Sequence, residues 1–266
     1  MALLEVGLLA RDALASGDGE VCAVFRRSLY LRMPASRYVC IGDRSLGRGP
    51  LNALVSDWRL LAALVPGERF AISTQDAKLW RPAKPVRAVW GPRLALRVDA
   101  LASAAAARVA DEGLGGAIAR RDTPLLRRAR PAMAALDGWL AASRREAVPS
   151  RTTALIGLGP GLTPSGDDYL AGMLVALRAF GRRDLAAMLW RWLAPRVPGR
   201  TSEISNAHLA AAAGGEAHEA LHTCLAALLG AKAPRWNERL AQLDRVGHCS
   251  GWDALAGALA VARRAA

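Results

Sequence analysis

The chain has 266 residues, is 52% hydrophobic and carries a formal net charge of +13 at neutral pH. This length allows one large domain or two smaller ones with real cores, and the hydrophobic content excludes an intrinsically disordered chain. The arginines are scattered, in pairs such as Arg120–Arg121 and Arg263–Arg264, with no basic run of four and no alternating aromatic platform, so we expect no nucleic-acid partner. The charge reflects either a general bias towards arginine or the attraction of a small anionic substrate.

The cysteine pattern and the N-terminal segment indicate the compartment. The cysteines at 22, 40, 224 and 249 lack the CxxC spacing of metal clusters, which favours a reduced, cytoplasmic protein. Residues 1–14 are apolar but contain Glu5, Arg11 and Asp12 and lack a basic start, so they predict an amphipathic helix rather than a signal peptide. No uncharged stretch reaches about 18 residues, so we expect no membrane span.

Residues 1–98 predict a small β-rich domain with one or two helices. Residues 51–65 favour a helix. Runs of β-branched, aromatic and alternating polar residues, separated by Gly-Pro turns, predict strands at 20–33, 37–43, 69–80 and 94–100.

Residues 99–266 are rich in alanine and leucine and predict a helical domain. One expected helix, 124–147, contains Pro131 as a candidate kink, and another starts near Asp167. The remaining helices are expected at 100–113, 184–196, 205–215, 216–230, 234–247 and 252–264. A β-rich domain followed by a helical one is an α+β fold.

The sequence GLGPGLTPSGDD, residues 157–168, concentrates unusual backbone chemistry in one loop. Gly157, Gly159 and Gly161 permit positive φ, whereas Pro160 and Pro164 fix φ and stiffen the loop. The loop lacks the Gly-Lys-Ser/Thr of a P-loop, and its proline breaks the dinucleotide-binding spacing.

Two interpretations of this loop remain open. In one, Thr163 or Ser165 caps the following helix and Asp167 and Asp168 interact with its dipole. In the other, the loop and the free N–H groups at the helix start bind a ligand, and the carboxylates bind magnesium or a substrate amide. We favour the second, because a cap alone needs fewer special residues; its candidate contacts are Gly159, Gly161, Thr163, Ser165 and Gly166.

A second segment, SGWDALAGALAVA at 250–262, aligns without gaps to SGDDYLAGMLVAL at 165–177. Ser250 matches Ser165 and Asp253 matches Asp168. The match is a coincidence of composition, an old duplication kept for packing, or two helix starts that converge on one pocket with Asp168 facing Asp253.

Two further clusters carry polar groups. TSEISNAH, at 201–208, is either a capping segment with Ser205 as the N-cap or a substrate-binding segment. HEALH, at 218–222, matches a zinc-peptidase motif whose third ligand would be Glu238, Asp244 or His248, but it also fits an ordinary helix surface. Cys249 lies beside His248 in the chain, and we expect it to be structural.

With these motifs assembled, the loop resembles the hallmark of an uncharacterised bacterial family. That family includes the AllH-type subunit assigned to oxamate carbamoyltransferase in anaerobic allantoin use, a branch of purine catabolism. GPLN at 49–52, TSEIS at 201–205 and GHCSGWD at 247–253 resemble its other elements, although Cys249 stands where a hydroxyl residue is expected. The resemblance implies conversion of oxalurate and phosphate to oxamate and carbamoyl phosphate, together with an acyl-CoA-synthetase-like (FdrA-type) partner subunit.

The candidate residues are compatible with that chemistry. Anionic substrates would be attracted by helix N-termini and arginines, and the loop N–H groups with the hydroxyls would hold transition-state charge. Asp167 or Asp168 would bind the carbamoyl NH₂ or magnesium, while Asn206 and His208 are polar contacts and His208 a candidate acid or base. The alternatives are a non-catalytic subunit whose loop binds a nucleotide or a partner, and a zinc hydrolase using HEALH.

Overall fold

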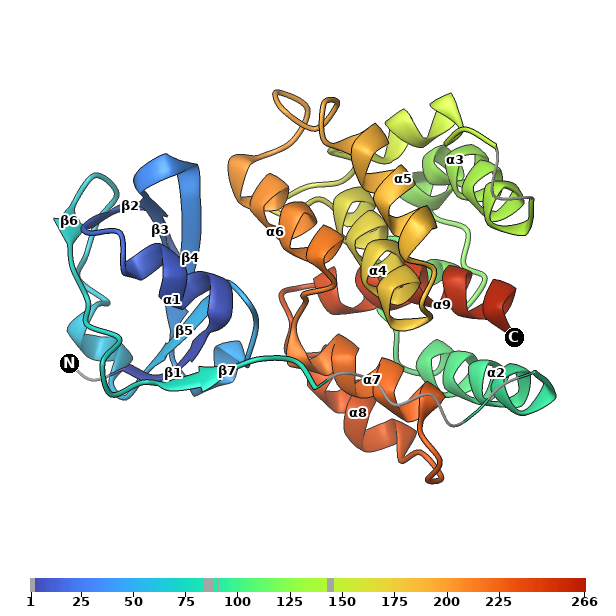
Figure 1. Ribbon diagram of the computed structural model, residues 1–266, viewed down its shortest axis with the longest axis horizontal. Coiled ribbons are helices and arrows are strands. Elements are labelled where there is room, and N and C mark those ends of the chain that lie inside the picture. Colours follow the sequence, from blue (N-terminus) through green and yellow to red (C-terminus); the bar gives the residue numbers. More distant parts are fainter. Residues whose placement is uncertain (1–2, 84–88, 90, 143–145) are drawn as a thin grey trace. The chain divides into compact units, whose positions relative to one another are not determined.

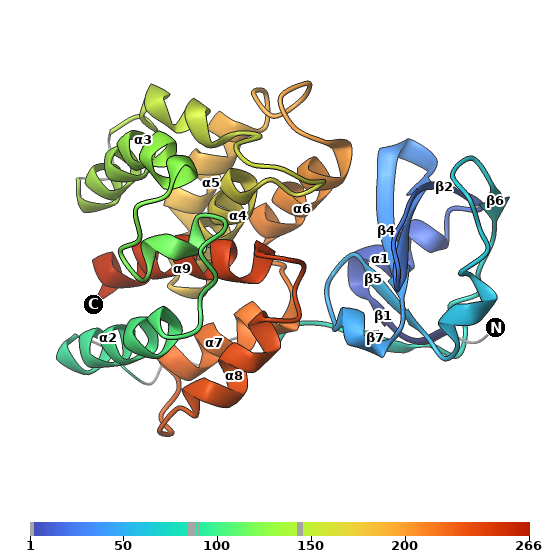
Figure 2. The same cartoon turned by 180° about the vertical axis from the view of Figure 1, so that it is seen from behind.

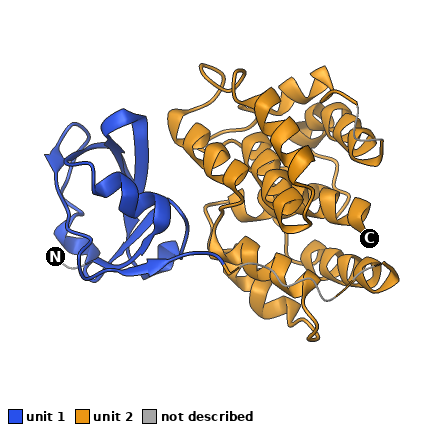
Figure 3. Cartoon of the chain, viewed as in Figure 1, with its two compact units in different colours: residues 1–82 blue, residues 83–266 orange. Residues whose placement is uncertain are grey.

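The computed structural model describes residues 3–83, 89, 91–142 and 146–266. Its contacts divide the chain into two compact units, residues 1–82 and 83–266 (Figure 3). The first unit is a sheet with one α-helix and the second is helical, which confirms the predicted α+β class (Figure 1). That the chain folds as two independent domains stays a prediction.

The first unit is built on a seven-stranded sheet in the order β6-β2-β3-β4-β5-β1-β7. The pairs β4–β5 and β1–β7 are parallel and the other neighbours are antiparallel. Helix α1 (Leu8–Leu14) contributes buried side chains to the same core as the strands. The strands are β1 (Leu3–Gly7), β2 (Gly19–Val24), β3 (Ser28–Met33), β4 (Arg37–Gly42), β5 (Asn52–Val55), β6 (Arg69–Phe70) and β7 (Lys78–Trp80).

Several expectations for this unit need correction. Residues 3–7 form β1, so only the second half of the expected N-terminal helix is helical. The expected strand at 20–33 is a hairpin of β2 and β3, and only the ends of the stretch 69–80 are paired, as β6 and β7. The expected helix at 51–65 contains β5 and a short 3-10 turn, Trp58–Leu60. Strand β5 is buried throughout between β4 and β1, and a short apolar run of that kind has no period that distinguishes strand from helix.

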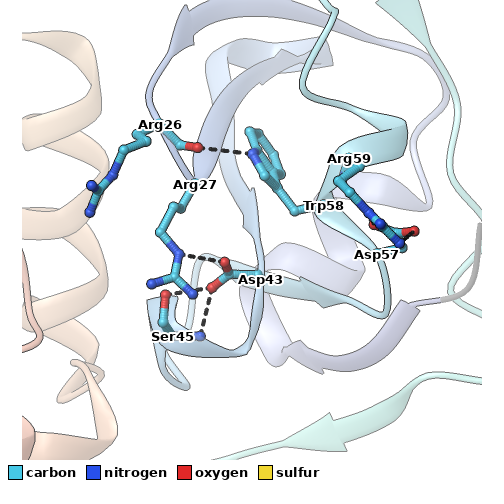
Figure 4. A network of polar contacts seen from close by, with 7 residues as sticks. All are labelled: Arg26, Arg27, Asp43, Ser45, Asp57, Trp58 and Arg59. Atoms are coloured by element: carbon cyan, nitrogen blue, oxygen red, sulfur yellow. Dashed lines mark hydrogen bonds and ion pairs between the residues drawn. The ribbon is translucent and has the colours of Figure 1, made fainter.

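Polar contacts fix two turns of this unit (Figure 4). The Arg27 guanidinium lies 2.6 Å from Asp43, whose other oxygen accepts the backbone N–H of Ser45 at 2.8 Å. The Trp58 indole donates to the carbonyl of Arg26 at 3.0 Å, which ties the 3-10 turn to the β2–β3 hairpin.

The second unit surrounds helix α9 (Ser250–Ala265), which contacts α2, α3, α4 and α7 (Figures 1 and 2). No helix in the described part of the chain is long and apolar enough to cross a bilayer. The other helices are α2 (Pro92–Ala106), α3 (Pro124–Ala141), α4 (Ser165–Ala179), α5 (Arg183–Leu193), α6 (Glu203–Gly214), α7 (Glu219–Leu229) and α8 (Trp236–Leu243).

Two boundaries of the helical region also need correction. The expected strand at 94–100 is part of α2, because Pro92 starts a helix and Leu94, Val98, Leu101 and Ala105 are buried at helical spacing. Helix α3 continues through Pro131 and ends at Ala141, and residues 143–145 of the expected helix lie outside the described residues.

Candidate functional site

The glycine-proline loop adopts the backbone that its sequence predicts. Gly157, Gly159 and Gly161 have φ of 69°, 115° and 91°. A Cβ on Gly157 would lie 2.1 Å from the carbonyl oxygen of Arg200, and one on Gly159 would lie 3.0 Å from the amide nitrogen of Ser165. The first two glycines are therefore needed both for their φ and for close packing.

The start of α4 differs from the expected arrangement. The N-cap residue is Pro164, which makes no side-chain cap bond, so neither Thr163 nor Ser165 is the cap. The first-turn amides are not free either, because Gly166 donates to the Leu158 carbonyl and Asp167 and Asp168 donate to that of Pro164, at 2.9 to 3.1 Å. The N-terminus of α4 therefore does not offer these amides to an anion.

The start of α9 repeats the two bonds to the N-cap carbonyl, whereas its glycine donates to a different position. Gly251 donates to the Val246 carbonyl at 3.1 Å, and Trp252 and Asp253 donate to that of Cys249 at 2.9 and 3.0 Å. Pro164 and Cys249 are separated by the 85 residues that relate the two segments in sequence. The likeness between the two segments thus extends from sequence to local structure.

The two repeated helices pack through their matching glycines. A Cβ on Gly172 would lie 1.9 Å from the Ala254 carbonyl oxygen, and one on Gly257 would lie 1.9 Å from the Tyr169 carbonyl oxygen. The contact is reciprocal, since the same 85-residue offset relates Tyr169 to Ala254. Close packing brings the two N-termini together.

Hydroxyl groups connect the two helix starts. The Oγ atoms of Thr163 and Ser250 are 3.1 Å apart, and Ser165 Oγ lies 3.7 Å from Cys249 Sγ. The hydroxyls predicted to cap α4 thus face the start of α9. Four candidate binding residues, Thr163, Ser165, Ser250 and Asp253, lie on these adjoining segments.

Both oxygens of Asp167 accept bonds from protein donors. Its Oδ1 accepts the Gly157 N–H at 2.9 Å, and its Oδ2 accepts the hydroxyls of Thr201 and Ser205 at 2.5 and 2.7 Å. Burial raises the pKa of this carboxyl, and the three donors partly oppose the rise. Asp167 therefore connects the glycine loop to the start of α6.

Asp168 and Asp253 have a different environment. The Oδ2 atom of each is buried and has no hydrogen-bond partner, although Asp168 as a whole is half-buried. Asp253 is 0% exposed, and its Oδ1 accepts the N–H of Gly115 at 2.6 Å. Each of the two matched aspartates thus has one carboxyl oxygen without a hydrogen-bond partner.

Burial sets the protonation of this pair. It raises the pKa of Asp253 to about 6, against the opposing contacts of Ser165 and the Gly115 amide. It raises the pKa of Asp168 well above the ordinary value, against the opposing hydrogen bonds of Ser250 and Thr163, and the nearby negative charge of Asp253 adds to the rise. Near neutral pH these two carboxyl groups therefore retain a proton more readily than ordinary aspartates do.

Cys249 is not an activated nucleophile. Burial and the neighbouring Asp253 raise the pKa of its thiol to about 12, so it is protonated at neutral pH. His248 lies against Glu112. No pKa shift activates the thiol.

The polar cluster before α6 serves mainly to start that helix. The N-cap is Ser202, whose Oγ accepts the Ser205 N–H at 2.9 Å, so the suggested cap at Ser205 is wrong. Ser205 is instead free to bond Asp167, and the Asn206 amide donates to the Ser202 carbonyl at 3.0 Å. Ser202 Oγ also donates to the carbonyl of Leu162, which is a second link between this segment and the glycine loop.

His208 belongs to a histidine cluster. Its ring stacks on that of His218, with centroids 6.0 Å apart, and burial lowers its pKa to about 3. It is neutral at physiological pH and cannot act there as an imidazolium acid.

The HEALH segment does not form a helical zinc motif. His218 is the N-cap residue of α7, with extended backbone angles, and His222 Nε2 accepts the Ala217 N–H at 3.1 Å. No group of three His, Cys, Asp or Glu among the described residues could hold a metal ion. The Asp167–Asp168 magnesium hypothesis does not fit either, because both oxygens of Asp167 accept bonds from the protein.

Two contributors to this site were not predicted as such. Gly115 supplies the N–H that holds Asp253, and Thr201 supplies a hydroxyl to Asp167. Thr201 lies in a hydroxyl-rich segment that the sequence marks, whereas nothing in the sequence near Gly115 indicates a contact with a residue 138 positions later.

Comparison with known proteins relates part of the chain to a described family. Residues 155–262 match the family model of oxamate carbamoyltransferase subunit AllH. The matched region contains both helix starts, Asp167, Asp168 and Asp253. No curated protein and no solved structure matches the chain.

Proposed function

We propose that this chain is an enzyme subunit that acts on a small anionic carbamoyl or carboxylate compound. Carbamoyl transfer between oxalurate and phosphate is the reaction we favour. The observation that carries the proposal is the meeting of two matched aspartates, Asp168 and Asp253, each with a buried oxygen that lacks a partner. The similarity of residues 155–262 to an oxamate carbamoyltransferase subunit supports it.

The unpaired oxygens select the kind of group that would bind. Leaving a buried acceptor without a partner costs about 1–3 kcal/mol, so a ligand with N–H donors would relieve that cost. A carbamoyl group ends in NH₂ and offers two such donors. The hydroxyls of Thr163 and Ser250, which lie 3.1 Å apart and both contact the Asp168 carboxyl, would adjoin this group.

The proposed reaction needs one proton to be moved. An oxygen of phosphate attacks the carbamoyl carbon of oxalurate, a C–O bond forms, and the C–N bond to the oxamate nitrogen breaks. The departing nitrogen takes up the proton that the phosphate loses. A carboxyl group with a raised pKa can hold this proton at neutral pH, so Asp168 is our candidate acid and Asp253 our candidate for binding the NH₂ group.

The two helix starts offer little to bind the phosphate substrate. Their first-turn amides bond to carbonyl groups, and buried carboxylates repel an anion. We therefore propose that a partner subunit, of the acyl-CoA-synthetase-like (FdrA-type) class, completes the site. The competing function is a non-catalytic subunit, in which the loop serves only to bind that partner.

The test is carbamoyl phosphate formation from oxalurate and phosphate, measured with the chain alone and with the candidate partner. We expect Asp168→Asn to reduce the rate at least a hundredfold, because an amide cannot donate the proton. The melting temperature should stay within a few degrees, because Oδ2 makes no bond to the protein and the amide keeps an oxygen for the contacts with Ser250 and Thr163. Arg128→Ala, on the exposed surface of α3, is the control for an unrelated substitution.

Full activity of Asp168→Asn in the active complex would assign catalysis to the partner. Absence of turnover under both conditions would sink the proposed reaction.

A further inference from the structure

A cavity of about 650 Å³ lies in the second unit, and no residue of the glycine loop lines it. Residues from the 117–121 segment, from α3 and from α9 line it, together with Tyr169 of α4. A second hollow of about 530 Å³, partly lined by α2, shares Ala117, Arg120 and Arg263 with the first. Volumes of 300–1,000 Å³ are typical of small-molecule sites.

The charge of the larger cavity is strongly positive. Five arginines line it, against one carboxylate, that of Asp137. The arginines come from three parts of the chain that are far apart in sequence: Arg120 and Arg121, Arg130, and Arg263 and Arg264.

Three of these arginines are already paired. Arg264 binds both oxygens of Asp137, Arg121 contacts Asp111, and Arg130 lies 2.8 Å from Asp122. The remaining two, Arg120 and Arg263, have no ion-pair partner within the described part of the chain, and both line both hollows. Both residues are exposed, so an anion can reach them from solvent.

Arg120 also adopts an unfavourable backbone. Its φ is 55°, in the left-handed region that costs a residue with a Cβ conformational energy. Glycine would adopt this angle without that cost. The position therefore keeps a guanidinium at the cavity despite the strain.

The rest of the cavity lining indicates which groups a ligand would carry beside its negative charge. Leu126, Met133 and Ala134 of α3 and Ala260 of α9 form an apolar wall. Tyr169 adds a hydroxyl that stays protonated, because burial and then Asp137 raise its pKa. An apolar wall beside unpaired guanidinium groups suits a ligand with an uncharged body and a charged end.

We propose that this cavity binds a phosphate-bearing small molecule of about the size of a mononucleotide. Arg120 and Arg263 bind the phosphate oxygens, since a guanidinium group matches phosphate through paired N–H bonds. The uncharged part of the ligand lies against Leu126 and Met133. The site is separate from the aspartate pair and does not depend on the proposed carbamoyl chemistry.

Isothermal titration of the full chain with AMP, ribose 5-phosphate and inorganic phosphate tests this proposal. We expect saturable binding of AMP or ribose 5-phosphate and much weaker binding of inorganic phosphate. Comparison of the affinities for AMP and ribose 5-phosphate shows whether the cavity binds a nucleotide or a sugar phosphate. Arg263→Ala should weaken binding roughly tenfold or more, since a hydrogen bond to a charged group is lost.

Arg120→Gly separates binding from stability. It should weaken binding to a similar extent while the melting temperature stays unchanged or rises, because the backbone strain is removed. Arg263→Lys should fall between the native chain and Arg263→Ala, because lysine keeps the charge and loses the paired donors.

The matched control is Arg128→Ala, which removes one positive charge from the exposed surface of α3 outside the cavity and should leave affinity within about threefold. Absence of saturable binding by any probe, or binding that survives both Arg263→Ala and Arg120→Gly, would overturn the proposal. Equal affinity for inorganic phosphate and AMP would overturn the assigned ligand size. None of these variants alters Asp168 or Asp253, so the outcome is independent of the carbamoyl transfer assay.

Discussion

Asp167 and Asp168 are neighbours in the chain with opposite environments. Asp167 accepts three bonds from Gly157, Thr201 and Ser205, whereas Asp168 has a buried oxygen that accepts none. A carboxylate with all its acceptors used stabilises the fold, and one with an unused acceptor can bind a ligand. The difference gives each aspartate a distinct test.

Asp167→Asn should destabilise the second unit by about 2–3 kcal/mol. The amide oxygen would keep the Gly157 N–H, but the charge-assisted bonds from the Thr201 and Ser205 hydroxyls would be lost, even where those hydroxyls turn to accept from the NH₂. Urea unfolding of this variant and of Asp168→Asn measures the contrast. A loss of stability in Asp168→Asn as large as that in Asp167→Asn would contradict the assigned roles.

Asp253 predicts a pH dependence of stability. Its pKa is about 6 in the folded chain and 3.8 as the ordinary value, so between these values the folded state binds more protons than the unfolded state. The contribution of Asp253 is therefore fully present at low pH and declines as pH rises to about 6. Between pH 5 and 7.5 the free energy of unfolding that Asp253 contributes falls by roughly 1 kcal/mol.

Asp253→Asn removes this titration and keeps an oxygen for the Gly115 N–H. The variant should therefore be less stable than the native chain by more at pH 5 than at pH 7.5. Urea unfolding of both proteins at each pH gives the difference, in which titrating groups remote from Asp253 cancel and the coupled Asp168 does not. A difference that does not change with pH would show that the Asp253 pKa is not raised.

At the scale of elements, the packing of α4 against α9 depends on Gly172 and Gly257. A Cβ at either position would come within 1.9 Å of a carbonyl oxygen of the other helix, so the two helices would have to separate. Separation would remove close packing and would also move Asp168 away from Asp253.

Gly172→Ala and Gly257→Ala should each destabilise the second unit by about 2 kcal/mol or more. Gly138→Ala in α3 is the matched control, because nothing lies within 4 Å of its Cβ. There the change should stabilise the chain by about 0.5–1 kcal/mol, since alanine is the better helix former. Thermal unfolding compares the three variants, and tolerance of alanine at Gly172 would contradict the close contact.

At the scale of the whole molecule, three half-buried histidines limit stability in acid. Burial lowers the pKa of His208 to about 3 and those of His218 and His222 to about 4, with 6.5 as the ordinary value. The unfolded chain takes up protons below pH 6.5 that the folded chain does not, so the folded state loses stability as pH falls.

Each histidine should cost the folded state roughly 1–2 kcal/mol at pH 5. Three such contributions are a large fraction of a typical stability of about 5–15 kcal/mol. We expect the helical unit to unfold at much lower urea concentration at pH 5 than at pH 7.5. His218→Gln should reduce this dependence, and an unchanged slope would show that His218 does not titrate in this way.

The sequence by itself determined the α+β class, most helices of the second unit, the positive φ of the loop glycines and the likeness of two helix starts. These are local properties, since glycine and proline restrict their own backbone and helical spacing repeats within a few residues. The sequence does not decide the structure of the short apolar segments at 51–65 and 94–100, because burial by distant strands or helices decides between strand and helix there.

Only the tertiary structure decided which of two adjacent aspartates is bonded, which hydroxyl caps a helix and where arginines gather. Asp253 meets Gly115 across 138 positions, and Arg120 lies beside the same cavity as Arg263. Hydrogen bonds and electrostatic contacts act over a few ångströms in space, whatever the separation along the chain. Folding alone brings these groups within that range.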